Sequence, residues 1–135
     1  MIGLPSLAQL DRSSGSILGG ARIWLATAQA DMRCGFDRLA DLAKQVTDQD
    51  PMSGHLFLFR SRGGDRLKVL YWDTDGYALW YKRLEQGVFK LPRPLISPTG
   101  AAKSVELRAS ELAMLLDGID LRSVKRVPRY QKKNV

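Results

Sequence analysis

Cationic side chains lie on both sides of a group of aromatic side chains between residues 60 and 83, and this combination is the clearest chemical signal in the sequence. The aromatic residues are Tyr71, Trp72, Tyr77, Trp80 and Tyr81, and the cations are Arg60, Arg62, Arg66, Lys68, Lys82 and Arg83. Cations bind phosphates and aromatic rings stack on bases, so the pattern is typical of a nucleic-acid-binding face. It is equally typical of a sheet whose aromatics fill the core and whose hairpin tips are solubilised by charge. Both interpretations stay open.

A second basic feature lies at the end of the chain. Residues 122–133 carry no acidic side chain and six cations: Arg122, Lys125, Arg126, Arg129, Lys132 and Lys133. Such a segment attracts a phosphate backbone without reading base sequence. The alternative is a terminus that only adds solubility. Pro128 excludes one continuous basic helix through the segment.

Catalytic candidates are few. A nucleophilic pair of Cys34 and His55 is conceivable, but a small inert cysteine and a structural or surface histidine explain both residues better. Carboxylates that could hold metal ions are explained by turn chemistry and by the polar face of a helix; they are Asp31, Asp37, Asp73, Asp75 and Glu85. Gly63-Gly64 lacks the rest of a phosphate-binding loop. We therefore predict no catalytic residue, no metal site, no cofactor and no small-molecule substrate.

Composition narrows the class of protein further. The 135 residues fit one domain, and 21 Lys and Arg against 14 Asp and Glu give a net charge of +7. Residues 21–120 hold 14 basic and 13 acidic side chains, so most of the excess lies in the tail. A single cysteine excludes a disulfide framework. Because the sequence has neither a signal-peptide pattern nor an apolar run of roughly 20 residues, we expect a cytoplasmic protein without a membrane partner.

Local patterns indicate the elements that must position these side chains. Strands are predicted at 21–27, 55–61, 66–73 and 77–84, with shorter candidates at 88–89 and 104–107. Glycine-containing turns at 62–65 and 74–76 predict two hairpins. Apolar residues recur at helical spacing after Asp31, which could cap a helix ending at Thr47. Ser110 is predicted to cap a short helix that Gly118 ends.

Together these elements predict a single α+β domain over residues 21–121. We expect an antiparallel meander sheet of four to six strands, with helix 35–47 packed on one face and helix 110–117 beside it. Residues 1–20 are predicted to be a flexible extension, 92–100 an irregular connection, and 122–135 a basic tail.

The same residues carry a family resemblance. The segments DMRCGFDRLADL (31–42), DPMSGHLFLFRSRGGDRLKVLYWDTDGYALWYKRLEQGVFKLP (50–92) and ELAMLLDGIDLR (111–122) closely resemble the accessory TnpB proteins of the IS66 family of bacterial insertion sequences. These proteins are products of the element's second open reading frame. Two features depart from the family pattern: residues 7–20 look inserted, and Cys34 stands where a basic residue is expected.

The resemblance implies a non-enzymatic protein that assists DNA transposition beside a separate, larger transposase. We expect contacts with DNA at the element ends, made by the hairpin cations and the tail. The alternative is a module that recruits or stabilises the transposase, using Trp72, Trp80 and Tyr81 as interface anchors.

Overall fold

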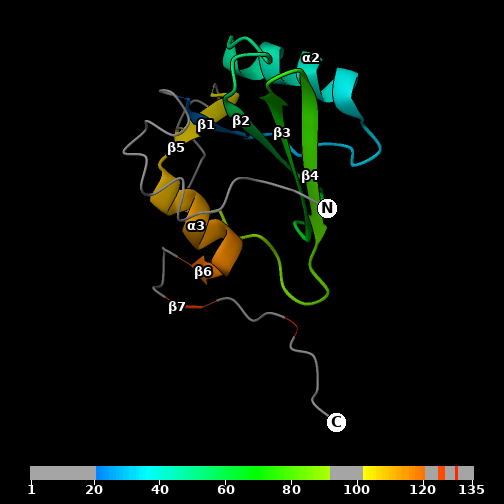
Figure 1. Ribbon diagram of the computed structural model, residues 1–135. Helices are drawn as coiled ribbons and strands as arrows, with labels where there is room; N and C mark the ends of the chain where they lie inside the picture. Colours follow the sequence, from blue (N-terminus) through cyan, green and yellow to red (C-terminus); the bar gives the residue numbers. More distant parts are fainter. Residues whose placement is uncertain (1–20, 92–101, 121–124, 127–129, 131–135) are drawn as a thin grey trace.

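The computed structural model describes residues 21–91, 102–120, 125–126 and 130. These residues form a central sheet with two helices packed against it (Figure 1). In chain order the elements are β1 (Ile23–Ala26), α2 (Phe36–Thr47), β2 (Leu56–Arg60), β3 (Arg66–Asp73), β4 (Gly76–Arg83), β5 (Ser104–Leu107), α3 (Ala109–Asp117), β6 (Ile119–Asp120) and β7 (Lys125–Arg126). The α+β class predicted from the sequence is confirmed.

The sheet is mixed, which corrects the prediction of an antiparallel meander. Its five strands are ordered β4-β3-β2-β1-β5, and β1 runs parallel to β2. The reason is the connection between them, since α2 crosses over between the two strands and lets β2 start at the same end as β1. The meander is limited to β2, β3 and β4. The last strand, β5, returns to pair with β1 at the opposite edge from β4.

Two tight hairpins join β2, β3 and β4, as the glycine-containing turns predicted. Strand β3 spans the predicted residues 66–73, and all eight of its residues pair consecutively with β4. The first turn depends on Gly64, whose φ of +78° is strained for any residue with a Cβ atom. The predicted strand at 88–89 is absent from the described residues. Instead, Phe89 is buried and its N–H donates to the carbonyl of Gly64.

The two helices cover opposite faces of the sheet, not the same face as predicted. One core contains Leu67, Val69 and Tyr71 of β3 together with Leu112 and Leu115 of α3. The other contains residues from the opposite side of the strands, packed with Leu39, Ala40 and Ala43 of α2. Figure 1 shows α2 and α3 on different sides of the strands. Because strand side chains alternate between faces, each strand contributes to both cores.

Both helices begin at residues other than the predicted caps. Helix α2 starts after Gly35, because Asp31 is engaged in a tight turn with Arg33. Helix α3 starts after Arg108, whose N–H donates to the Glu111 carboxylate at 3.0 Å. Its predicted end is confirmed, since Gly118 adopts a φ of 85° there.

Several predicted segments lie outside the described residues. These are the extension at 1–20, the connection at 92–100 and most of the tail. Within the tail, Lys125–Arg126 forms strand β7, which pairs antiparallel with β6. Among the described helices, none is long and apolar enough to cross a membrane.

Candidate nucleic-acid interface

The first hairpin is held in place on both sides at its tip. The Ser61 hydroxyl accepts from the backbone N–H of Arg66 and donates to the Asp65 carboxylate. On one side, the N–H of Ala30 donates to the carbonyl of Arg60 at 2.9 Å, which pins the segment after β1 against the tip. On the other side, the N–H of Leu84 donates to the carbonyl of Asp65. The side chains around this tip are therefore displayed from a fixed backbone.

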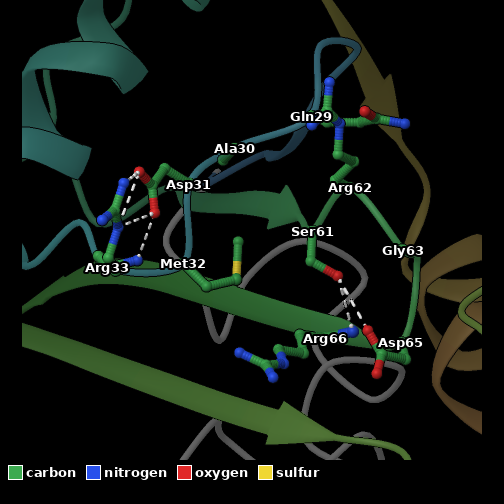
Figure 2. A pocket seen from close by; sticks show the side chains of 10 residues that line it. All are labelled: Gln29, Ala30, Asp31, Met32, Arg33, Ser61, Arg62, Gly63, Asp65 and Arg66. Carbon is green, nitrogen blue, oxygen red and sulfur yellow. Dashed lines mark hydrogen bonds and ion pairs between the residues drawn. The ribbon is translucent and has the colours of Figure 1, made fainter.

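A hollow of about 680 Å³ opens between the hairpin tip and the segment after β1. Figure 2 shows its lining, with Arg33, Arg62 and Arg66 reaching it from different parts of the chain. Arg33 follows β1, Arg62 sits in the turn, and Arg66 begins β3. Three arginines line this one concave surface, with Arg62 extending toward Gln29 and away from Arg33 and Arg66 in Figure 2. Arginine side chains suit an oxyanion such as a phosphate.

The charges around the hollow are only partly neutralised. Arg33 donates to both carboxylate oxygens of Asp31, and these hydrogen bonds hold the pKa of that carboxyl at about 2. The Arg33 side chain is nevertheless 91% exposed. Among the described residues, no carboxylate lies within 4 Å of the guanidinium of Arg62 or Arg66. These two cations are free to bind an external anion.

The basic surface continues along the α2 side of the sheet. Arg66 lies directly opposite Arg83 on β4, so the two side chains share a face. The Arg66 guanidinium approaches the hydroxyl of Tyr81 at 3.5 Å, and Tyr81 is 43% exposed. Arg83 is paired with Glu85 at 3.0 Å, which raises the pKa of its guanidinium. We refer to Arg33, Arg62, Arg66 and Arg83 as the arginine cluster.

Two of the predicted phosphate-binding cations are engaged inside the protein. Lys68 is only 6% exposed, and its ammonium donates to the carbonyls of Met32 (2.7 Å) and Cys34 (2.8 Å). It also lies 4.7 Å from the centre of the Tyr81 ring. Arg60 donates to the carbonyl of Phe89 at 3.0 Å, and its burial lowers the pKa of its guanidinium. Both residues fasten loops to the sheet.

The remaining predicted residues do not form one surface. Lys82 lies opposite Leu67 on the α3 side of the sheet, away from Arg66 and Arg83. Trp80 is on the same side, packed against the α3 core. Trp72 is on the α2 side, where its ring meets Tyr77 edge-on at 5.1 Å. It lies at the far end of β3 from Arg66, about 20 Å away at the usual rise per residue.

Comparison with known proteins assigns the amino-acid sequence to a family. The profile of the family described as IS66 Orf2 like protein matches residues 21–126. The chain belongs to the IS66 Orf2-like family. The match indicates an accessory protein of a transposable element.

Two similar relatives of this Orf2-like protein come from Sinorhizobium fredii (strain NBRC 101917 / NGR234). Uncharacterized protein y4hO is 40% identical over 101 residues, which cover 75% of this chain and 83% of the relative. Uncharacterized protein y4jC is 36% identical over 109 residues, which cover 81% of this chain and 88% of the relative. No solved structure matches the chain.

The candidate catalytic residues of this Orf2-like protein have structural contacts. The Nδ1 atom of His55 accepts the backbone N–H of Arg22 at 2.8 Å, while burial lowers the pKa of its imidazole. Cys34 is half-buried against the α2 core, and its carbonyl accepts from Lys68. Within the described part of the chain, no three His, Cys, Asp or Glu side chains are grouped as a metal site would require.

Sequence reasoning missed Arg33 as a member of the site. It lies 29 positions before Arg62, in a segment predicted to begin a helix. The available signal was the pair Asp31 and Arg33, which favours a local turn when an Asx side chain accepts the N–H two residues later. Its place in the lining depends on the parallel bridge between Ala30 and Ser61, which brings its segment beside the hairpin tip and which no local pattern encodes.

Proposed function

We propose that this Orf2-like protein assists transposition by binding DNA through its arginine cluster, without catalysing a reaction itself. The observation that carries the proposal is the hollow lined by Arg33, Arg62 and Arg66, two of which have no carboxylate partner among the described residues. Contacts between arginine side chains and phosphates hold the sugar-phosphate backbone of DNA and fix the orientation of a protein on a duplex.

Tyr81 supports a more specific role for the same surface. Its exposed ring lies beside the guanidinium of Arg66, so an aromatic face and a cation are presented together. A ring at this place could stack on an unpaired base while Arg66 holds the adjacent phosphate. We therefore propose that the surface binds duplex DNA at the element ends and tolerates locally opened strands.

The basic tail is proposed to add affinity without specificity. Its six cations would pair with backbone phosphates on either side of the site held by the arginine cluster. In this arrangement, the cluster sets the position of the protein and the tail lengthens its residence on DNA. The partner transposase of the same element would then meet this protein on the DNA ends.

Fluorescence anisotropy with labelled element-end duplex at several salt concentrations tests the proposal. The Arg62→Ala/Arg66→Ala variant removes two cations from the hollow. Each phosphate contact contributes about 0.9 to the slope of log K against log salt, so the slope should flatten by about 1.8. The Lys44→Ala/Lys103→Ala variant is the matched control, because it removes two exposed cations from other parts of the surface.

The control variant should retain the slope of the unmodified protein. Equal slopes for the two double variants would show that the hollow has no special role in DNA binding. Absence of binding at low salt would refute the whole proposal. Circular dichroism and urea titration of each variant would ensure that a lost slope reflects lost contacts and not unfolding.

A further inference from the structure

Strand β4 forms an open edge of the sheet. Within the described residues it pairs with β3 alone, and the pairing runs without a bulge from the pair of Asp73 and Gly76 to the pair of Arg66 and Arg83. The outer side of such a strand carries a row of backbone N–H and C=O groups able to pair with another strand. β4 is eight residues long and contains no proline. It therefore lacks three of the devices that keep an edge strand from pairing, namely short length, proline and a bulge, and its charged residues are confined to its last two positions.

The charges along this edge are arranged with opposite signs at its two ends. Asp75 lies in the turn before β4, while Lys82 and Arg83 end the strand. Between them stand the residues Tyr77–Tyr81, which carry no formal charge. Two copies of the strand running antiparallel would bring the acidic end of each beside the basic end of the other.

We propose that a second copy of this chain pairs along β4, joining two sheets into one across a two-fold axis. In an antiparallel pair, a hydrogen-bonded position always lies opposite another hydrogen-bonded position, and such positions alternate along each strand. When the two strands are identical, the two-fold axis must therefore pass where a residue faces its own copy. With the axis at Leu79, Tyr77 lies opposite the partner's Tyr81, and Ala78 lies opposite the partner's Trp80. Asp75 then lies opposite the partner's Arg83.

The neighbouring register is less favourable. With the axis at Trp80, Ala78 would oppose the partner's Lys82 and Tyr77 would oppose the partner's Arg83. Both cations would then lie against neutral side chains, and Asp75 would have no basic residue opposite it. Opposite charges directly across strands stabilise a pair of strands, so the register centred on Leu79 is selected.

The half-buried side chains of β4 fit this partner. Tyr77, Ala78, Leu79 and Trp80 are each only partly covered within one chain. Partly covered apolar side chains on both sides of an edge strand gain contacts when a second sheet continues the first. The same pairing would extend the α2 face and the α3 face of one copy into the corresponding face of the other.

Sedimentation velocity of the full chain at about 1–200 µM tests the proposal. A concentration-dependent dimer is expected. Asp75→Arg and Arg83→Asp should each weaken dimerisation by about tenfold or more, because each places like charges opposite one another twice in the dimer. The double variant Asp75→Arg/Arg83→Asp should restore it. Glu106→Arg, an exposed change on β5 at the opposite edge of the sheet, is the matched control and should leave dimerisation unchanged.

The register is tested by cross-linking in a Cys34→Ser background. Leu79→Cys should form an interchain disulfide on mild oxidation, because identical positions face each other only at the axis. Trp80→Cys should form it far more slowly. Circular dichroism would establish that each variant is folded before these rates are compared.

Three results would overturn the proposal. The first is a full chain that stays monomeric over the whole concentration range. The second is a dimer whose stability does not respond to charge reversal, or which the double variant does not restore. The third is a dimer that forms only when residues 1–20 are deleted, since that segment would then be the occupant of the β4 edge.

Discussion

Replacing Lys68 by methionine tests whether this lysine holds the protein together or binds DNA. The side chain connects β3 to the segment before α2 through the carbonyls of Met32 and Cys34. Methionine keeps most of the apolar stem and removes the ammonium. We expect Lys68→Met to destabilise the fold and to leave the contacts with DNA intact.

The magnitude follows from the groups left behind. A hydrogen bond to a charged group is worth about 1.5–3 kcal/mol, and Lys68 makes two. The Tyr81 ring adds about 0.5–1 kcal/mol as a cation–π contact. Two effects offset part of this decrease in unfolding free energy. The variant does not have to bury an ammonium, and the freed carbonyls can form hydrogen bonds with water. The net decrease in unfolding free energy should therefore be about 2–4 kcal/mol.

Urea denaturation followed by tryptophan fluorescence measures this change. With an m-value of about 2 kcal/mol/M, the midpoint should fall by about 1–2 M. Lys82→Met is the matched control, because Lys82 is exposed on the neighbouring strand and its loss should change stability by less than about 0.5 kcal/mol. Midpoints that coincide for the two variants would refute the structural role of Lys68.

The same two proteins separate stability from DNA binding. If Lys68 fastens the loop and does not touch phosphate, Lys68→Met should keep the salt slope of the unmodified protein under conditions where it is folded. A slope flattened by about 0.9 would show instead that its ammonium reaches a phosphate.

Three further predictions concern other parts of the molecule. Because the pKa of His55 is lowered in the folded protein, the unfolded chain binds a proton more readily, and the free energy of unfolding should fall as the pH drops below about 6.5. His55→Asn keeps a hydrogen-bond acceptor for the Arg22 N–H and should reduce this pH dependence. Urea titrations at pH 5.5 and 7.5 measure the difference. Gly64→Ala should lower the free energy of unfolding by about 1–2 kcal/mol, because the φ of Gly64 is +78° and a Cβ atom would press on the Arg60 side chain. Gly63→Ala is the control and should leave the free energy of unfolding nearly unchanged; thermal melts of both variants measure this. Replacing the six cations at 122–133 with glutamine should flatten the salt slope on duplex DNA by about 4–5 units, and an unchanged slope would exclude the tail from binding.

The strands were predictable because their signals are local. Alternation within 66–73 assigned Leu67, Val69 and Tyr71 to one face, and that face is buried. Turn residues located both hairpins for the same reason, since turn chemistry depends on a few neighbouring residues. In the first turn the positive φ falls on Gly64, whereas in the second it falls on Thr74 and not on Gly76. The parallel pairing of β1 and β2 was missed, because it depends on where a crossover helix returns the chain.

Solvation of the cations was not predictable in this way. Arg60, Arg62, Arg66 and Lys68 are close in sequence and identical in charge, yet Arg60 and Lys68 bind backbone carbonyls, Arg66 is half-buried and Arg62 is exposed. The difference arises from segments far along the chain, since Lys68 meets residues 32 and 34 and Arg60 meets residue 89. An alternating strand pattern assigns side chains to a face but does not say what covers it.

Local sequence patterns were enough for the α+β class, the hairpins, the family and the concentration of positive charge near the end of the chain. Which arginines line the same hollow depends on the tertiary fold, because the bridge of Ala30 to Ser61 brings the segment that carries Arg33 beside the hairpin tip that carries Arg62. It also decided that both faces of β3 are buried, since α2 and α3 lie on opposite sides. Charge and periodicity are properties of neighbouring residues, whereas exposure depends on which distant segments pack against them.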